Sequence, residues 1–151
     1  MRAPFTQLFL HCVWATWDRL PILTPQLERP VYTAITVKCQ ELKCEVMAIC
    51  GMPDHIHLLV RLHPTIAVAD LLKGVKGASS HLVTHKVAVG EFFKWQGSYG
   101  AFTIGKGDVS RIKAYIERQK EHHARNNLRQ EWELVESPDS GEQENETASG
   151  D

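Results

Sequence analysis

The chain has 151 residues, enough for one domain with a proper hydrophobic core, and its 43% apolar content is that of an ordinary globular protein. No uninterrupted apolar run approaches the ~20 residues that span a membrane, and the N-terminus leads straight into an alternating segment, so we expect neither a membrane helix nor a secretory signal. The net charge is −1, but residues 136–151 contain six acidic residues and no basic one. The part of the chain before them has 17 basic and 12 acidic residues. Its net charge of +5 suits an anionic partner.

The cysteines indicate a reducing compartment. They form no CxxC pair, and nothing in the chain points to secretion. We therefore expect free thiols that behave as small buried hydrophobes, and a cytoplasmic location. The four positions are Cys12, Cys39, Cys44 and Cys50.

The first predicted elements are a strand and a helix. Residues 5–17 are rich in aromatic and β-branched side chains on both faces, which is typical of a central strand. Thr24 is a plausible N-cap with Pro25 at the first helical position, and apolar residues recur at helical spacing from there to about residue 43.

The middle and the end of the chain repeat this alternation. Two apolar stretches, 44–51 and 55–62, are separated by only three residues, which predicts a hairpin. A second helix is predicted at about 68–87. A short last strand follows at 101–104, and a third helix runs over about 109–126 after an N-cap at Asp108.

The order β-α-β-β-α-β with an added C-terminal helix predicts an α+β fold. It is the ferredoxin-like arrangement, a sandwich also found in RNA-recognition (RRM-like) domains, with helices on one face of an antiparallel sheet. We expect residues 1–130 to form this domain. Residues 136–151 have no apolar periodicity and are expected to be a disordered acidic tail.

The second strand of the hairpin carries the first functional signal. Side chains alternate along a strand, so His55 and His57 share one face while Ile56 and Leu58 share the other and can enter the core. Two imidazoles side by side form half of a divalent-metal site, although paired histidines on a strand are more often structural. His11 would join their face if the strand register permits.

The third helix supplies a second signal. Residues three and four apart share a helix face, so Tyr115, Gln119 and His122, or else His123, line one side. A tyrosine hydroxyl, with a pKa of ~10, is a poor nucleophile at neutral pH unless a metal polarises the electrophile. Gln119 offers a neutral oxygen ligand, and two imidazoles with one amide oxygen suit Mg²⁺ or Mn²⁺ with positions left open for phosphate oxygens. A zinc site of Cys50, His55 and His57 fits by residue type, but the intervening turn disfavours it.

These residues resemble the single-tyrosine HUH transposases of small bacterial insertion sequences, the IS200-like transposase family. The histidine pair alone is a weak motif, but five blocks in the family's order are strong together and cover roughly residues 5–125. The matching segments are His11-Cys12-Val13-Trp14 with Arg19, residues 52–59 around the histidine pair, Lys76-Gly77-Ala78-Ser79-Ser80, residues 95–99, and residues 115–123.

The resemblance implies a metal-dependent DNA strand transferase. Tyr115 would attack a DNA phosphodiester and form a 5′-phosphotyrosine, while His55, His57 and Gln119 hold Mg²⁺ or Mn²⁺. The implied substrate is single-stranded DNA with hairpin ends, handled by a homodimer in a bacterial or archaeal cytoplasm without a nucleotide cofactor. His11 and His122 would support the metal ligands, and the candidate nucleic-acid contacts are Arg19, Lys76, Ser79, Trp95 and Tyr99.

Two departures from the family pattern bear on the contacts with DNA, and two alternative functions stay open beside the resemblance. Trp17-Asp18-Arg19 stands where many relatives carry a more basic lysine–tyrosine–arginine run, and the chain stops soon after the third helix. A domesticated relative that acts on repeated palindromes is one alternative. A single-stranded nucleic-acid-binding module without chemistry is another, but the full set of tyrosine, histidines and glutamine argues against it.

Overall fold

The computed structural model describes residues 2–124 and 132–136, except for the side chains of 122–124. Its four strands form one antiparallel sheet in the order β2-β3-β1-β4, which confirms the predicted ferredoxin-like arrangement. The strands are β1 (Phe9–Ala15), β2 (Glu45–Met52), β3 (His55–Arg61) and β4 (Gly100–Ile104). The predicted tail lies outside the described residues apart from Glu136.

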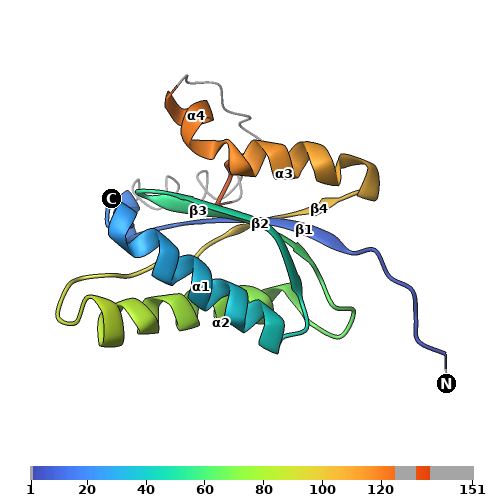
Figure 1. The fold of residues 1–151 in the computed structure, drawn as a ribbon, viewed down its shortest axis with the longest axis horizontal. Helices are drawn as coiled ribbons and strands as arrows, with labels where there is room; N and C mark the ends of the chain where they lie inside the picture. The colour runs from blue at the N-terminus through green and yellow to red at the C-terminus, as the bar shows by residue number, and fades with distance from the viewer. Residues whose placement is uncertain (1, 125–131, 137–151) are drawn as a thin grey trace, which may run out of the picture.

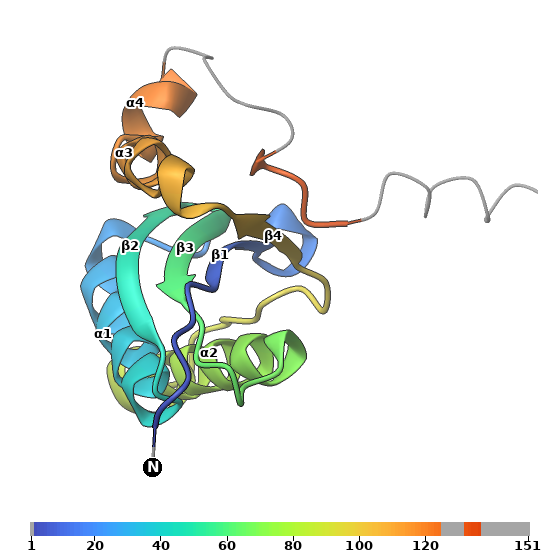
Figure 2. The ribbon, with the colours of Figure 1, turned by 90° about the vertical axis from the view of Figure 1, so that its right-hand side faces the viewer.

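Helices lie on both sides of this sheet (Figures 1 and 2). Two of them, α1 (Pro25–Glu41) and α2 (Val68–Leu82), cover one face. On the opposite face lies α3 (Val109–Glu117), followed by the short α4 (Gln119–Ala124). None of the helices in the described parts of the chain is long and apolar enough to cross a membrane.

The first strand is central and buried along its whole length, as predicted, but it is shorter than predicted. Residues 5–8 do not enter the sheet, and the Phe5 side chain is 82% exposed. After β1 the chain turns through a 3₁₀ segment, Trp17–Arg19, in which Asp18 and Arg19 both have positive φ. The apolar composition therefore overestimated the length of the strand at both ends, and beyond Ala15, among the described residues, only an isolated bridge between Thr16 and Trp95 continues the pairing.

The helices begin where predicted but differ in detail. Thr24 precedes α1 with Pro25 in the first turn, yet its side chain makes no capping hydrogen bond. The predicted helix 68–87 is α-helical to Leu82 and π-helical over Val83–Val87. The prediction of one unbroken helix over 109–126 is wrong, because the helix breaks at Arg118, where φ is −102° and ψ is 20°.

Strand β3 divides two apolar clusters. Ile56, Leu58 and Val60 face the main core against α1 and α2. Leu59 faces the other side and packs with Ile112 and Ile116 of α3. A slip of one residue would exchange the two faces, so burial on both sides fixes the register and holds the histidines on the α3 side.

We predict that Leu58→Ala destabilises the domain by about 2–5 kcal/mol, because it removes a fully buried side chain and leaves a cavity. Urea unfolding followed by circular dichroism measures this change. Val37→Ala is the control, since Val37 is an exposed helix residue and its loss should change stability by about 0.5 kcal/mol or less. Equal effects of the two substitutions would contradict the assignment of β3 to the core.

Candidate active site

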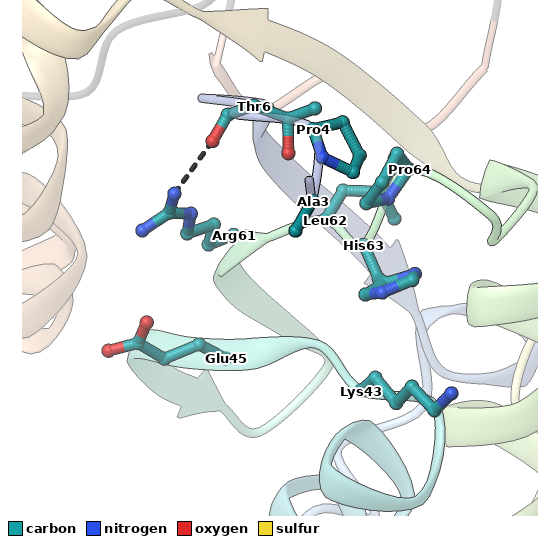
Figure 3. A pocket seen from close by; sticks show the side chains of 9 residues that line it. All are labelled: Ala3, Pro4, Thr6, Lys43, Glu45, Arg61, Leu62, His63 and Pro64. Atoms are coloured by element: carbon teal, nitrogen blue, oxygen red, sulfur yellow. Dashed lines mark hydrogen bonds between the residues drawn. The ribbon is translucent and has the colours of Figure 1, made fainter. Parts of the chain in front are cut away.

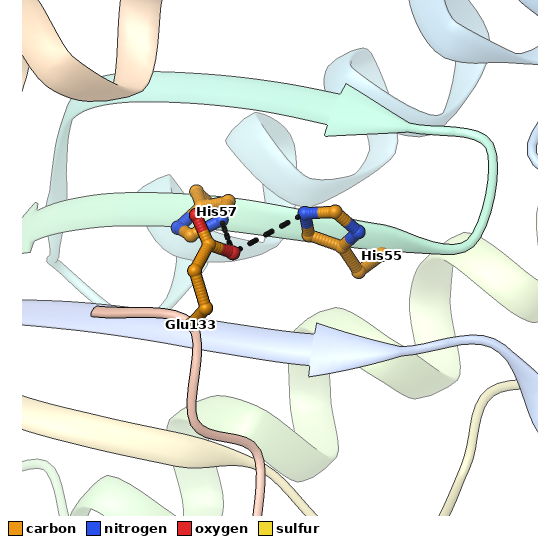
Figure 4. Close-up of side chains that lie close together, drawn as sticks. All are labelled: His55, His57 and Glu133. Carbon is orange, nitrogen blue, oxygen red and sulfur yellow. Dashed lines mark hydrogen bonds and ion pairs between the residues drawn. The ribbon is translucent and has the colours of Figure 1, made fainter. Parts of the chain in front are cut away.

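The two histidines of β3 are buried and present the same ring nitrogen to one space. The Nδ1 atom of His55 lies 2.6 Å from the Asp54 carboxylate, and Nδ1 of His57 lies 2.9 Å from Nε2 of His11. Their Nε2 atoms lie 3.4 Å and 2.9 Å from a single oxygen, Oε2 of Glu133 (Figure 4). Histidines whose second nitrogen is fixed in this way are typical of metal ligands.

The strand register brings His11 to this face, as predicted. It pairs with Leu59 across β1 and β3, and its ring stacks on that of His57 with 5.2 Å between centroids. Burial lowers the pKa of His11 to about 3, so its imidazole is neutral at physiological pH. The neutral ring of His11 is therefore placed to orient His57 through this hydrogen bond.

Tyr115 and Gln119 reach the same point from the helix face of the site. The Tyr115 hydroxyl donates a hydrogen bond to Oε1 of Glu133 at 2.7 Å, and the Gln119 amide donates to the same oxygen at 2.7 Å. Both side chains are buried. The break at Arg118 thus does not separate them, because α4 starts at Gln119 itself, directly after α3.

Glu133 is the residue at this site that the sequence reasoning missed. It lies 14 residues beyond Gln119, between the predicted last helix and the predicted tail, and no predicted element includes it. Burial raises its pKa, but hydrogen bonds from His55 and His57 oppose burial and hold the pKa well below its usual range. The carboxylate is therefore ionised.

The pKa of the neighbouring His55 is raised. Burial lowers this pKa, but the hydrogen bonds to Asp54 and Glu133 outweigh the effect of burial.

The donor atoms fit a divalent cation. One ligand atom from each of His55, His57 and Glu133 lies within 4.8 Å of the others. The Gln119 amide is oriented by its bond to a carboxylate, which can only accept, and this leaves Oε1 buried with no partner in the described part of the chain. Two imidazole nitrogens with carboxylate and amide oxygens suit Mn²⁺ or Mg²⁺. Cys50 does not belong to this cluster.

The predicted DNA-contacting residues differ in exposure. Trp95 is buried and its indole N–H donates to Oγ of the buried Ser79 at 2.9 Å, so this pair anchors the loop before β4. Lys76 is half-buried and donates to the carbonyls of Gln96 and Ser98 in that loop. A DNA contact by Ser79 or Trp95 would require this packing to open.

Arg19 lies closer to the histidine pair. Its guanidinium is 3.5 Å from the Asp54 carboxylate that also holds His55, and its side chain is about half exposed. Tyr99 is partly buried at the rim of a cavity of about 300 Å³ that Lys76 also lines. These positions permit contact with DNA, which stays a prediction. The side chain of His122 lies outside the described residues.

A separate concavity of about 360 Å³ lies at the opposite end of β3 from His55 (Figure 3). Lys43, Glu45 and Arg61 line it together with the N-terminal segment. The Arg61 guanidinium donates to the Thr6 carbonyl at 2.6 Å, which ties that segment to the sheet. This cavity contains neither the histidine pair nor the tyrosine.

Comparisons with known proteins give a family match and a curated relative. The family described as "Transposase IS200 like" matches residues 4–119. The ISDra2 transposase TnpA of Deinococcus radiodurans is 28% identical over 120 residues, which cover 75% of this chain and 84% of that protein.

Two solved structures share the fold. One is a crystal structure from Deinococcus radiodurans, described as that of a transposase, with a TM-score of 0.63 and 26% identity. The match covers 79% of this chain and 95% of that chain. A REP-associated tyrosine transposase bound to a REP hairpin has a TM-score of 0.61 at 18% identity, covering 82% of this chain and 72% of that one.

We predict that His57→Ala weakens Mn²⁺ binding by about 10-fold or more, because it removes one of two imidazole ligands. Isothermal titration calorimetry measures the affinity without any DNA. His63→Ala is the matched control, since His63 lies beyond the far end of β3 and bonds Thr65 instead. Equal Mn²⁺ affinity in both variants would exclude the histidine pair as a metal site.

Proposed function

The chain belongs to the IS200-like transposase family, and on this premise we propose that it cleaves and rejoins single-stranded DNA at insertion-sequence ends. The observation that carries the proposal is the convergence of a tyrosine hydroxyl, an amide and two imidazoles on one anionic group. Each of these groups contacts an oxygen of the Glu133 carboxylate in the structure. In the same place the groups can donate hydrogen bonds to a phosphate oxygen, and the imidazole nitrogens can bind a cation.

In the proposed reaction Tyr115 is the nucleophile. Its oxygen attacks the phosphorus of a phosphodiester, a bond from oxygen to phosphorus forms, and the bond from phosphorus to the 3′-oxygen breaks. The phenolic proton is lost from Tyr115 and a proton is gained by the 3′-oxygen, which leaves a 5′-phosphotyrosine and a free 3′-OH. Attack of a 3′-OH on that linkage reverses the step, so rejoining consumes no nucleotide cofactor.

We assign the metal to His55 and His57, with Gln119 as the oxygen donor whose Oε1 is unused. Glu133 is the alternative oxygen donor of the cluster. A bound Mg²⁺ or Mn²⁺ would polarise a non-bridging phosphate oxygen and so make the phosphorus more electrophilic. Asp54 and His11 hold the two histidines in orientation from behind.

The remaining parts of the proposal follow from the family. The substrate is single-stranded DNA with hairpin ends in a bacterial or archaeal cytoplasm, a homodimer is the working unit, and Arg19 and Tyr99 are candidate DNA contacts. Action on repeated palindromes is the second candidate. It is favoured by the fold shared with the REP-associated transposase, and palindromes repeated through the genome rather than flanking the gene would distinguish it.

We predict that Tyr115→Phe abolishes covalent protein–DNA adducts, because the substitution removes the attacking oxygen and little else. Denaturing gel electrophoresis of the chain with labelled single-stranded oligonucleotides measures the adduct. Tyr32→Phe is the matched control and should retain adduct formation, because Tyr32 of α1 lies on the opposite face of the sheet, where its hydroxyl accepts a hydrogen bond from the Gly51 backbone N–H. An adduct formed by the Tyr115→Phe variant would exclude this residue as the nucleophile.

We also predict that EDTA abolishes adduct formation and that added Mn²⁺ or Mg²⁺ restores it. His57→Ala should lose the adduct at metal concentrations that saturate the unsubstituted chain, whereas His63→Ala should behave as the unsubstituted chain does. The same gel assay measures both effects. Full activity in EDTA would rule out the metal.

A further inference from the structure

Residues 132–136, which we call the strap, lie across the sheet on the side of α3 (Figures 1 and 2). The close-up shows the Glu133 side chain pointing from the strap to His57 and His55 (Figure 4). The strap lies beyond α4 in sequence, and its Glu133 contacts the same face of the site as Tyr115 of α3. It thus lies where DNA would have to approach Tyr115.

The Glu133 carboxylate has the contacts that a substrate phosphate would need. Oε2 faces the Nε2 atoms of both histidines, and Oε1 accepts the hydrogen bond of the Tyr115 hydroxyl at 2.7 Å. A phosphodiester under attack must likewise place one oxygen toward the metal ligands and its phosphorus beside that hydroxyl. The Glu133 carboxylate and the phosphodiester are both anionic and would accept hydrogen bonds from the same donors. They therefore cannot occupy the site together.

Trp132 fills the neighbouring space in the manner of a nucleobase. Its indole meets the Tyr115 ring edge-on with 4.8 Å between centroids, and the Arg111 guanidinium carbon lies 5.4 Å from the indole centroid. Proteins hold unpaired bases against aromatic rings and under guanidinium groups, and the Arg111 guanidinium lies over the face of this indole. Trp132 and Glu133 thus place an aromatic ring beside an anionic group, as a nucleotide places its base beside its phosphate.

The rest of the strap is fitted to the sheet. The Leu134 backbone passes so close to Gly100 that a Cβ there would overlap the Leu134 carbonyl oxygen. Farther along, a Glu136 carboxylate oxygen accepts hydrogen bonds from Gln96 and Ser98, each at 3.2 Å. The strap is therefore held at both ends and in the middle.

We propose that the strap is a built-in competitor of single-stranded DNA, with Glu133 in the place of the scissile phosphate and Trp132 in the place of an adjacent unpaired base. This inference rests on the proposed function for the nature of the ligand. The apparent affinity for DNA is then reduced by the fraction of molecules with an open site, so a tenfold excess of the docked strap weakens binding about tenfold. DNA that binds must displace the strap.

The test measures DNA binding without cleavage. Fluorescence anisotropy of a labelled single-stranded oligothymidine is recorded in EDTA for the full chain and for three variants. The double variant Trp132→Ala/Glu133→Ala removes both mimicking groups. Gly100→Ala displaces the strap without changing any charge, although its Cβ also comes within 3.0 Å of the Val13 side chain, and Gly100 does not have the positive φ that would itself penalise alanine.

The third variant, Glu117→Gln, controls for charge, because it removes one exposed carboxylate from α3 that lies outside the strap. We expect the first two variants to bind DNA about tenfold more tightly than the unsubstituted chain and Glu117→Gln to change affinity by about twofold or less. Thermal unfolding confirms that each variant is folded. Unchanged DNA affinity in both strap variants overturns the proposal.

Measurements of metal affinity distinguish two roles of Glu133, that of a competitor of DNA and that of a required metal ligand. Calorimetric titration with Mn²⁺ should give equal or tighter binding in the double variant. A loss of about tenfold or more in Mn²⁺ affinity would overturn the competitor role. These outcomes are independent of the adduct assay, so a chain that never forms an adduct fails the proposed function while the strap is still judged by DNA binding.

Discussion

The alternation of side chains along β3 is the constraint on which the rest of the structure depends. Ile56, Leu58 and Val60 are anchored in the main core, so the histidines between them can only face the other way. Leu59 then gives α3 an apolar surface on that same side, against which Ile112 and Ile116 pack. The strand thereby positions both halves of the site, the imidazoles directly and the tyrosine through the helix that it holds.

Electrostatics determines which ligands can bind between the hydrogen-bond donors of this site. Two histidine Nε2 atoms, a phenol and an amide N–H converge in a buried space, and such an arrangement is stable only around an anion or a cation with its ligands. Glu133 supplies the anion in the structure. The same demand explains how a site that we propose to hold a metal and a phosphate can also be filled by a side chain of the chain itself.

Several interpretations of the sequence depend on the fold. Ser79 and Trp95 bond each other in the interior and hold the loop before β4, so their expected contact with DNA stays a prediction that requires this packing to open. The predicted third helix is broken at Arg118, although the i, i+4 relation of Tyr115 and Gln119 correctly placed both at one point. Periodicity predicts which face a residue takes, whereas caps, breaks and burial of polar pairs depend on neighbours distant in sequence.

The sequence by itself determined the order of the elements, the face of the histidine pair and the pairing of Tyr115 with Gln119, because each follows from a local period of two or 3.6 residues. Only the tertiary structure decided that His11 bonds His57 across two strands, because register is a property of pairing. It also decided that Glu133 enters the site. That contact joins residues 76 positions apart and involves a segment that no predicted element includes.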